Sequence, residues 1–187
     1  MNKIKLFSSW LKRKSTGWVT LIALIIFLLF MAIVLPGQSS RAEAVSGEAG
    51  SPDLSFYYPA DKLYSMAEAY GPDGRLEFVR VRFTFDLFFP LIYTFFLVTS
   101  ISWLFSRTFG NESPWQLANL APMIGMLLDF LENTCTSIVM LRYPDATQVI
   151  ASLASFFTMG KWIFVVASFL FVIIGLFGTT WKWFKTR

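Results

Sequence analysis

Residues 162–181 read WIFVVASFLFVIIGLFGTTW and contain no charged side chain. An α-helix needs roughly 20 apolar residues to cross the hydrocarbon core of a bilayer, and this run has that length. Two further runs without charge extend from Ser15 to Ser40 and from Leu87 to Ser106. Runs of this kind predict a polytopic membrane protein.

The composition of the whole chain supports the same class, because 55% of its 187 residues are hydrophobic and only 15% are charged. We predict an all-α fold, a single integral membrane domain built as a four-transmembrane-helix bundle. The predicted segments are a basic cytoplasmic tail (1–17), four transmembrane helices (18–35, 84–106, 115–141 and 147–180), an extracytoplasmic loop of roughly 48 residues between the first two helices (36–83), and a second cytoplasmic tail (181–187).

Basic residues predict the orientation of these helices. They flank the first and last predicted spans, namely Lys3, Lys5, Lys12, Arg13 and Lys14 at one end and Lys182, Lys185 and Arg187 at the other. Since cytoplasmic flanks are enriched in Lys and Arg, both termini should be cytoplasmic, in a plasma membrane of the bacterial type. A cleaved signal peptide ending near Ala42-Glu43-Ala44 is the alternative, but an apolar run of about 18 residues is longer than the usual 7 to 15, which favours an uncleaved anchor.

The predicted loop divides into three parts. Residues 36–52 (PGQSSRAEAVSGEAGSP) are small and polar, which predicts a flexible linker. From Asp61 to Tyr70 apolar residues follow helical spacing until Gly71-Pro72 stops the pattern, which predicts a short amphipathic helix, either an ordinary loop helix or a functional lid. Residues 75–83 should extend the next helix and carry Arg80 and Arg82.

Two residue types limit the chemistry. The chain has no histidine and a single cysteine, Cys135. The commonest general base and the commonest metal ligand are therefore missing, so we expect no metal and no cofactor. The basic residues form no array suited to nucleic acid. The expected partners are membrane lipids and partner membrane subunits.

Ionisable residues inside the predicted spans are the main functional candidates, because charges in hydrocarbon are costly and usually face a bundle interior. There are four, Asp86, Asp129, Glu132 and Lys161. Counted at roughly 1.5 Å per residue from the cytoplasmic end of each helix, they lie at about 30, 21, 26 and 28 Å respectively. They should form one polar layer in the outer half of the membrane.

Helical spacing adds neighbours to this layer. Asn133 shares a stripe with Asp129, and Thr158 shares one with Lys161, so the two stripes should face each other. Pro90 cannot donate to the carbonyl of Asp86, which leaves an acceptor-rich point for Lys161 or the Tyr93 hydroxyl. Trp162 either anchors its helix at the outer interface or lines a pocket.

Charge counting raises a question about the layer. Three acids face one lysine, so unless Arg82 reaches in, two negative charges lack partners. Protons, a bound cation or a ligand should then neutralise them.

Four functions remain open on this basis. The favoured one is a structural or accessory membrane subunit, in which the polar groups only satisfy one another. The polar layer can also bind a lipid or small amphiphile. The alternatives are a membrane-embedded acid-base enzyme acting on a lipid, and a proton or cation pathway. The catalytic residues of such an enzyme are not identified by the sequence, and a non-enzymatic role is favoured.

Overall fold

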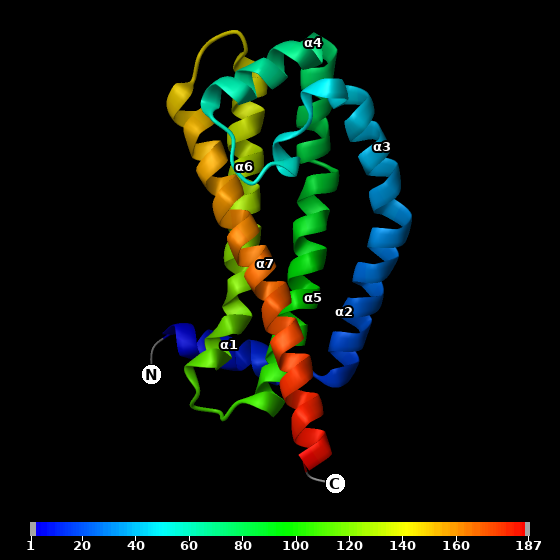
Figure 1. Cartoon of the computed structure of the whole chain (residues 1–187), viewed down its shortest axis with the longest axis vertical. Helices are drawn as coiled ribbons and strands as arrows, with labels where there is room; N and C mark the ends of the chain where they lie inside the picture. Colours follow the sequence, from blue (N-terminus) through cyan, green and yellow to red (C-terminus); the bar gives the residue numbers. More distant parts are fainter. Residues whose placement is uncertain (1–2, 186–187) are drawn as a thin grey trace. The chain divides into compact units, whose positions relative to one another are not determined.

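The computed structural model describes residues 3–185, apart from the side chains of residues 41, 42, 44, 45, 48 and 54. Its helices are α1 (Lys3–Lys14), α2 (Gly17–Leu29), α3 (Leu35–Ser46), α4 (Ala60–Arg82), α5 (Phe85–Thr108), α6 (Ala121–Arg142) and α7 (Gln148–Lys185), seen in Figure 1. Shorter helical turns are η1 (Phe30–Val34), η2 (Gly47–Ala49), η3 (Pro52–Leu54) and η4 (Pro114–Leu120). No strand occurs within residues 3–185, so the all-helical prediction is confirmed for them.

Two parts of the predictions lie outside the described residues. The ends of the predicted cytoplasmic tails, residues 1–2 and 186–187, are not described, nor are the side chains of Ala42 and Ala44 at the alternative cleavage site.

Four helical segments are long and apolar enough to cross a membrane. They are Gly17–Ser40, Ala60–Thr108, Pro114–Arg142 and Gln148–Lys185. Each contains one of the predicted spans or nearly all of it. The membrane boundaries and the single-domain organisation stay predictions.

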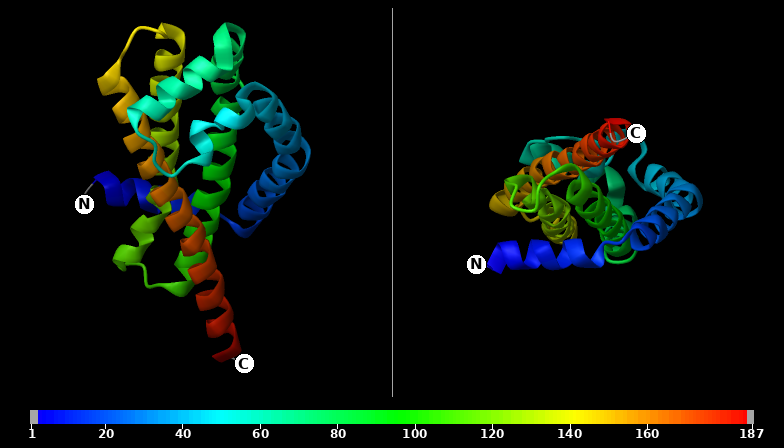
Figure 2. Two further views of the ribbon diagram at one scale, coloured as in Figure 1. Left: turned by 45° about the horizontal axis from the view of Figure 1, so that its top comes forward. Right: turned by 90° about the horizontal axis from the view of Figure 1, so that it is seen from below.

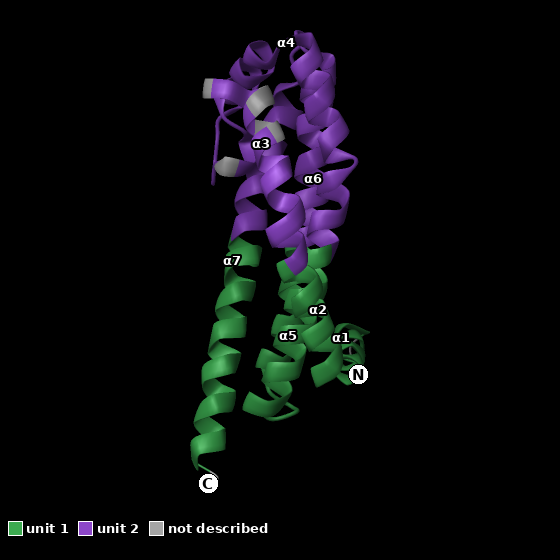
Figure 3. Cartoon of the chain, turned by 90° about the vertical axis from the view of Figure 1, so that its right-hand side faces the viewer, with its two compact units in different colours: residues 1–28, 92–125, 163–187 green, residues 29–91, 126–162 purple. Residues whose placement is uncertain are grey.

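The chain forms two compact units, coloured separately in Figure 3. Unit 1 comprises residues 1–28, 92–125 and 163–187, and unit 2 comprises residues 29–91 and 126–162. Helices α5, α6 and α7 each contribute residues to both units.

The linker prediction for residues 36–52 is wrong over most of its length. Helix α3 continues to Ser46, with Pro36 in its first turn, where a missing N–H is tolerated. The sequence that follows, RAEAVS, consists mainly of residues that tolerate a helix well. The chain leaves the helix only at Gly47, whose φ of 49° is in the region that glycine adopts without strain.

Helix α4 tests the other two parts of the loop prediction. Its first half buries Leu63, Met66 and Tyr70, as the spacing predicted. Gly71, with φ of 63° and ψ of 177°, interrupts the helical conformation before Pro72. The second half is helical as predicted, but it ends on Arg82, and a turn at residues 83–84 separates it from α5.

The hydrophobic core of unit 2 fixes the surroundings of the candidate site. Its buried members come from the loop, α4, α6 and α7, and they are Tyr58, Leu63, Met66, Ala67, Tyr70, Phe78, Val139, Met140, Ala151 and Ala154. The apolar side of α4 therefore packs on α6 and α7 within this unit.

Candidate functional site

Lys161 on α7 joins three carboxylates of unit 2. Its Nζ lies 3.5 Å from Asp129 Oδ1 and 3.2 Å from Asp53 Oδ1, and it also pairs with Glu132 Oε2. Only 6% of the lysine is exposed. The sequence-based expectation that Asp129, Glu132 and Lys161 come together is therefore met in the structure.

Arg82, the last residue of α4, is the second buried cation. Its Nη2 lies 2.5 Å from Asp53 Oδ2, and its Nη1 donates to Asp86 Oδ2, four residues further along the chain. The guanidinium carbon also lies 4.2 Å from the centre of the Phe78 ring. Arg82 does reach into the layer, and it takes the place beside Asp86 that we had assigned to Lys161 or Tyr93.

Asp53 connects the two cations. It lies in η3, outside the predicted spans, and its side chain is 33% exposed. Burial raises the pKa of this carboxyl, but Arg82 and Lys161 outweigh that effect and hold the pKa well below its usual range. Asp53 is therefore ionised at neutral pH. We call Asp53, Arg82, Asp86, Asp129, Glu132 and Lys161 the charge network.

Tyr58 attaches the same loop to α7 at a second point. Its backbone N–H donates to Ser155 Oγ at 3.1 Å, and its hydroxyl lies 3.1 Å from Thr158 Oγ1. Because the Thr158 hydroxyl donates to the carbonyl of Ala154, the tyrosine hydroxyl is the donor of this pair. Burial and the charge of Glu132 raise the pKa of Tyr58, which keeps that proton in place.

The remaining predicted site residues take different places. Asn133 donates to Asp129 Oδ1 at 3.4 Å, and the Trp162 ring centre lies 5.7 Å from Lys161 Nζ. Tyr93 is buried in unit 1. Ligand binding by any of these residues stays a prediction.

The structure adds two residues to the layer but leaves its net charge as predicted. Arg82 adds a positive charge, and Asp53 adds a negative one. If every group is ionised, four carboxylates face two cations, so an excess of two negative charges persists. Glu132 is 1% exposed, and its Oε1 has no hydrogen-bond partner among the described atoms. A buried acceptor of this kind needs a proton or a cation beside it.

Sequence reasoning missed Asp53 and Tyr58 and named Arg82 only conditionally. Tyr58 ends the aromatic stretch Phe56-Tyr57-Tyr58, and Asp53 lies three residues before it. Aromatic residues of this size rarely stay in a solvated linker, so this stretch was the available signal that the loop folds back.

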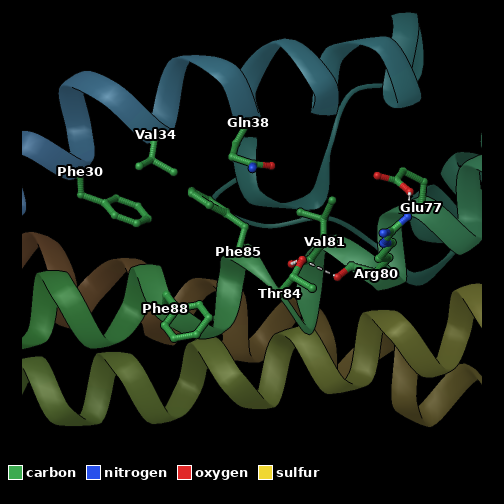
Figure 4. A pocket seen from close by; sticks show the side chains of 9 residues that line it. All are labelled: Phe30, Val34, Gln38, Glu77, Arg80, Val81, Thr84, Phe85 and Phe88. Carbon is green, nitrogen blue, oxygen red and sulfur yellow. Dashed lines mark hydrogen bonds and ion pairs between the residues drawn. The ribbon is translucent and has the colours of Figure 1, made fainter.

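Unit 2 also contains a groove of about 650 Å³, shown in Figure 4. One wall comes from η1 and α3, and the other from α4, α5 and Thr84 between them. Its apolar lining is formed by Phe30, Val34, Val81, Phe85 and Phe88, and its polar lining by Gln38, Glu77, Arg80 and Thr84. Arg80 Nη1 and Glu77 Oε2 lie 3.9 Å apart, so the polar part carries one charge of each sign.

Within the described residues, no group of three or more His, Cys, Asp or Glu side chains is placed to hold a metal ion. No family model matches the chain, and comparisons with curated proteins and with solved structures find no match. The geometry of the charge network is therefore the basis for a functional assignment.

Proposed function

We propose that this chain is a small integral membrane protein with a structural or accessory role, in which the charge network holds the extracytoplasmic loop against the helices. The single observation behind this is the position of Asp53. One loop carboxylate is shared by two buried cations, Arg82 from α4 and Lys161 from α7. Sequence-distant segments thus depend on one another for charge compensation.

Burial of the network supports a structural role over acid-base catalysis. A general acid or base must reach the proton that it moves. Glu132 and Lys161 are 1% and 6% exposed, and Lys161 is already paired with three carboxylates of its own chain. These groups stabilise the fold from within it.

The distribution of charge supports the orientation in this proposal. Unit 1 contains Glu112 as its single acidic residue in the sequence, out of twelve in the chain. It contains nine of the sixteen basic residues, namely Lys3, Lys5, Lys12, Arg13, Lys14, Arg107, Lys182, Lys185 and Arg187. Such an imbalance favours a cytoplasmic location for the termini.

Hydrogen exchange of the loop tests the proposed role of Asp53. We expect Asp53→Asn to speed amide exchange in residues 47–59 about tenfold, because a partly exposed ion pair shared by two buried cations is worth about 1 to 3 kcal/mol. The matched control is Glu68→Gln, which neutralises an exposed acid on α4. Equal exchange in the two variants would refute the proposal.

The pH dependence gives a second readout of the same contact. Because the folded pKa of Asp53 is lowered, its contribution is fully present above the unfolded value of about 3.9 and is lost as the pH falls toward the folded value. After correction for intrinsic exchange rates, protection of residues 47–59 should be equal at pH 5 and pH 8.

The groove favours a second candidate function, the binding of a lipid or small amphiphile. Its lining is apolar apart from Gln38, Thr84 and the pair of Glu77 and Arg80, which suits an acyl chain and a polar head of both signs. Native mass spectrometry after gentle extraction should show a retained lipid in the parent protein and less of it in Arg80→Gln. Exposed Lys62→Gln is the control, and a bound protein subunit in place of lipid would instead support the accessory role alone.

A further inference from the structure

Helix α1 has three different sides. Ser8, Leu11 and Ser15, spaced at i, i+3 and i+7, lie on the side that faces the protein, and Ser8 and Ser15 are buried. The other two sides differ in character. The apolar side presents Leu6, Phe7 and Trp10, all of which are exposed, with Lys3 and Lys14 at its two ends, and the polar side presents Lys5, Ser9, Lys12 and Arg13.

Buried hydrogen bonds fix α1 in unit 1. Ser8 Oγ donates either to Asn119 Oδ1 at 2.8 Å or to the Gln116 carbonyl at 3.0 Å. Asn119 Nδ2 in turn donates to the Ser8 carbonyl at 3.1 Å and to Ser102 Oγ at 2.9 Å. Asn119 is 1% exposed, so this contact belongs to the buried interior of unit 1. Helix α1 is thereby joined to η4 and α5 at a defined angle.

That angle places α1 across the neighbouring helices. Within unit 1 it lies crosswise to α2 and to the adjoining part of α5 (Figures 1 and 2). If α2 and α5 cross the bilayer, α1 lies along the plane of the membrane surface. A helix in that position, with one apolar side and one basic side, has the arrangement of interfacial helices.

The charges of α1 are not compensated within the described part of the chain. Its five charged residues are all basic, and no ion pair involves α1 among residues 3–185. Lys12 donates to a neutral amide, Asn111 Oδ1, at 3.2 Å. These charges are therefore open to anions from outside the protein.

We propose that α1 is an interfacial helix that binds the phosphate groups of anionic phospholipids, with Leu6, Phe7 and Trp10 inserted among the acyl chains and Lys5, Lys12 and Arg13 on the headgroups. The exposed apolar side favours bilayer lipid over a soluble phosphate as the ligand. A soluble anion gives those aromatic side chains no partner.

Lipid competition on the full chain tests this proposal. The protein in detergent is titrated with phosphatidylglycerol and phosphatidylcholine, and native mass spectrometry gives the ratio of the two bound lipids. Each basic side chain near a lipid surface contributes about fivefold to the binding of anionic lipid, so Lys5→Gln/Lys12→Gln/Arg13→Gln should lower the preference for phosphatidylglycerol at least tenfold. The control Lys62→Gln/Arg75→Gln/Arg142→Gln makes the same change of charge in unit 2 and should keep the preference.

Salt and a soluble phosphate provide two further tests of the same proposal. Raising the salt concentration from 50 to 500 mM should weaken the preference of the parent protein, because exposed charges are screened. Glycerol phosphate at millimolar concentration should not compete, since it lacks acyl chains. An unchanged preference in the α1 variant, an equal loss in the control, or full competition by glycerol phosphate would each overturn the proposal.

Discussion

The carboxylates of the charge network are not equivalent. Asp53 and Asp86 pair with Arg82, and Lys161 serves the other two acids as well as Asp53. The network therefore has more acids than cations. Removal of a cation enlarges that imbalance, whereas removal of an acid reduces it.

This asymmetry predicts unequal results for substitutions at two residues that contact each other, Glu132 and Lys161. Glu132→Gln keeps the shape and removes one excess charge, so the free energy of unfolding should change by less than about 1 kcal/mol. Lys161→Met removes the shared cation and should lose about 3 to 5 kcal/mol. Thermal unfolding of both variants in one detergent measures the difference.

Equal destabilisation by the two substitutions would mean that the charges are balanced pair by pair. In that case the excess of negative charge would not exist. Unaltered stability of Glu132→Gln, by contrast, would identify Glu132 as a position where a proton is accommodated without loss of the fold.

The members of the charge network that lie on long helices could be predicted from the sequence. Asp129, Glu132 and Lys161 were found because helical rise and periodicity place them at similar depths. Asp53 could not be found in this way, since a loop residue has no depth until the path of the chain is known. Arg82 was anticipated only through the charge count.

At the scale of elements, small residues determine how closely helices approach within unit 1. A Cβ added to Gly175 on α7 would lie 2.7 Å from Leu104 Cβ on α5. Thr108 Oγ1, also on α5, lies 3.3 Å from the carbonyl oxygen of Gly175. Close approach at a small residue therefore brings α5 and α7 together. It is the arrangement by which membrane helices pack in the absence of a hydrophobic driving force.

We expect Gly175→Ala to force α5 and α7 apart and to lower the free energy of unfolding by about 1 to 3 kcal/mol. The control is Gly110→Ala in the same unit, where nothing lies within 4 Å of the added Cβ. Thermal unfolding of the two variants in the same detergent measures the effect. Equal unfolding temperatures would show that the helix contact adjusts freely and does not stabilise the unit.

The element boundaries show a second limit of sequence reasoning. The apolar runs predicted four long helices because hydrophobicity is a property of each residue. The segment forming α3 is predicted as linker because residues 36–52 are small and polar. Its continuation from the preceding helix outweighs these weak local preferences, since propagation of a helix is easier than its nucleation.

At the scale of the whole molecule, the unequal distribution of charge between the two units predicts the topology. We expect a Cys introduced at Ser55, in a Cys135→Ala background, to react with a membrane-impermeant maleimide added to intact cells. Of two reporters fused to the C-terminus, the one that is active in the cytoplasm should give a signal, and the one that is active outside the cell should not. Labelling of residue 55 only after permeabilisation would reverse the proposed orientation.

The order in which the chain is synthesised gives the Lys161 contacts a further meaning. Helix α6, which carries Asp129 and Glu132, leaves the ribosome before the helix that supplies their cation. If α6 spans the membrane as predicted, its two acids lie in hydrocarbon without this cation until α7 is inserted, and such a position is energetically costly. A chain that stops before Lys161 would then carry an acidic segment without its cation, and we expect it to be open to quality-control proteolysis.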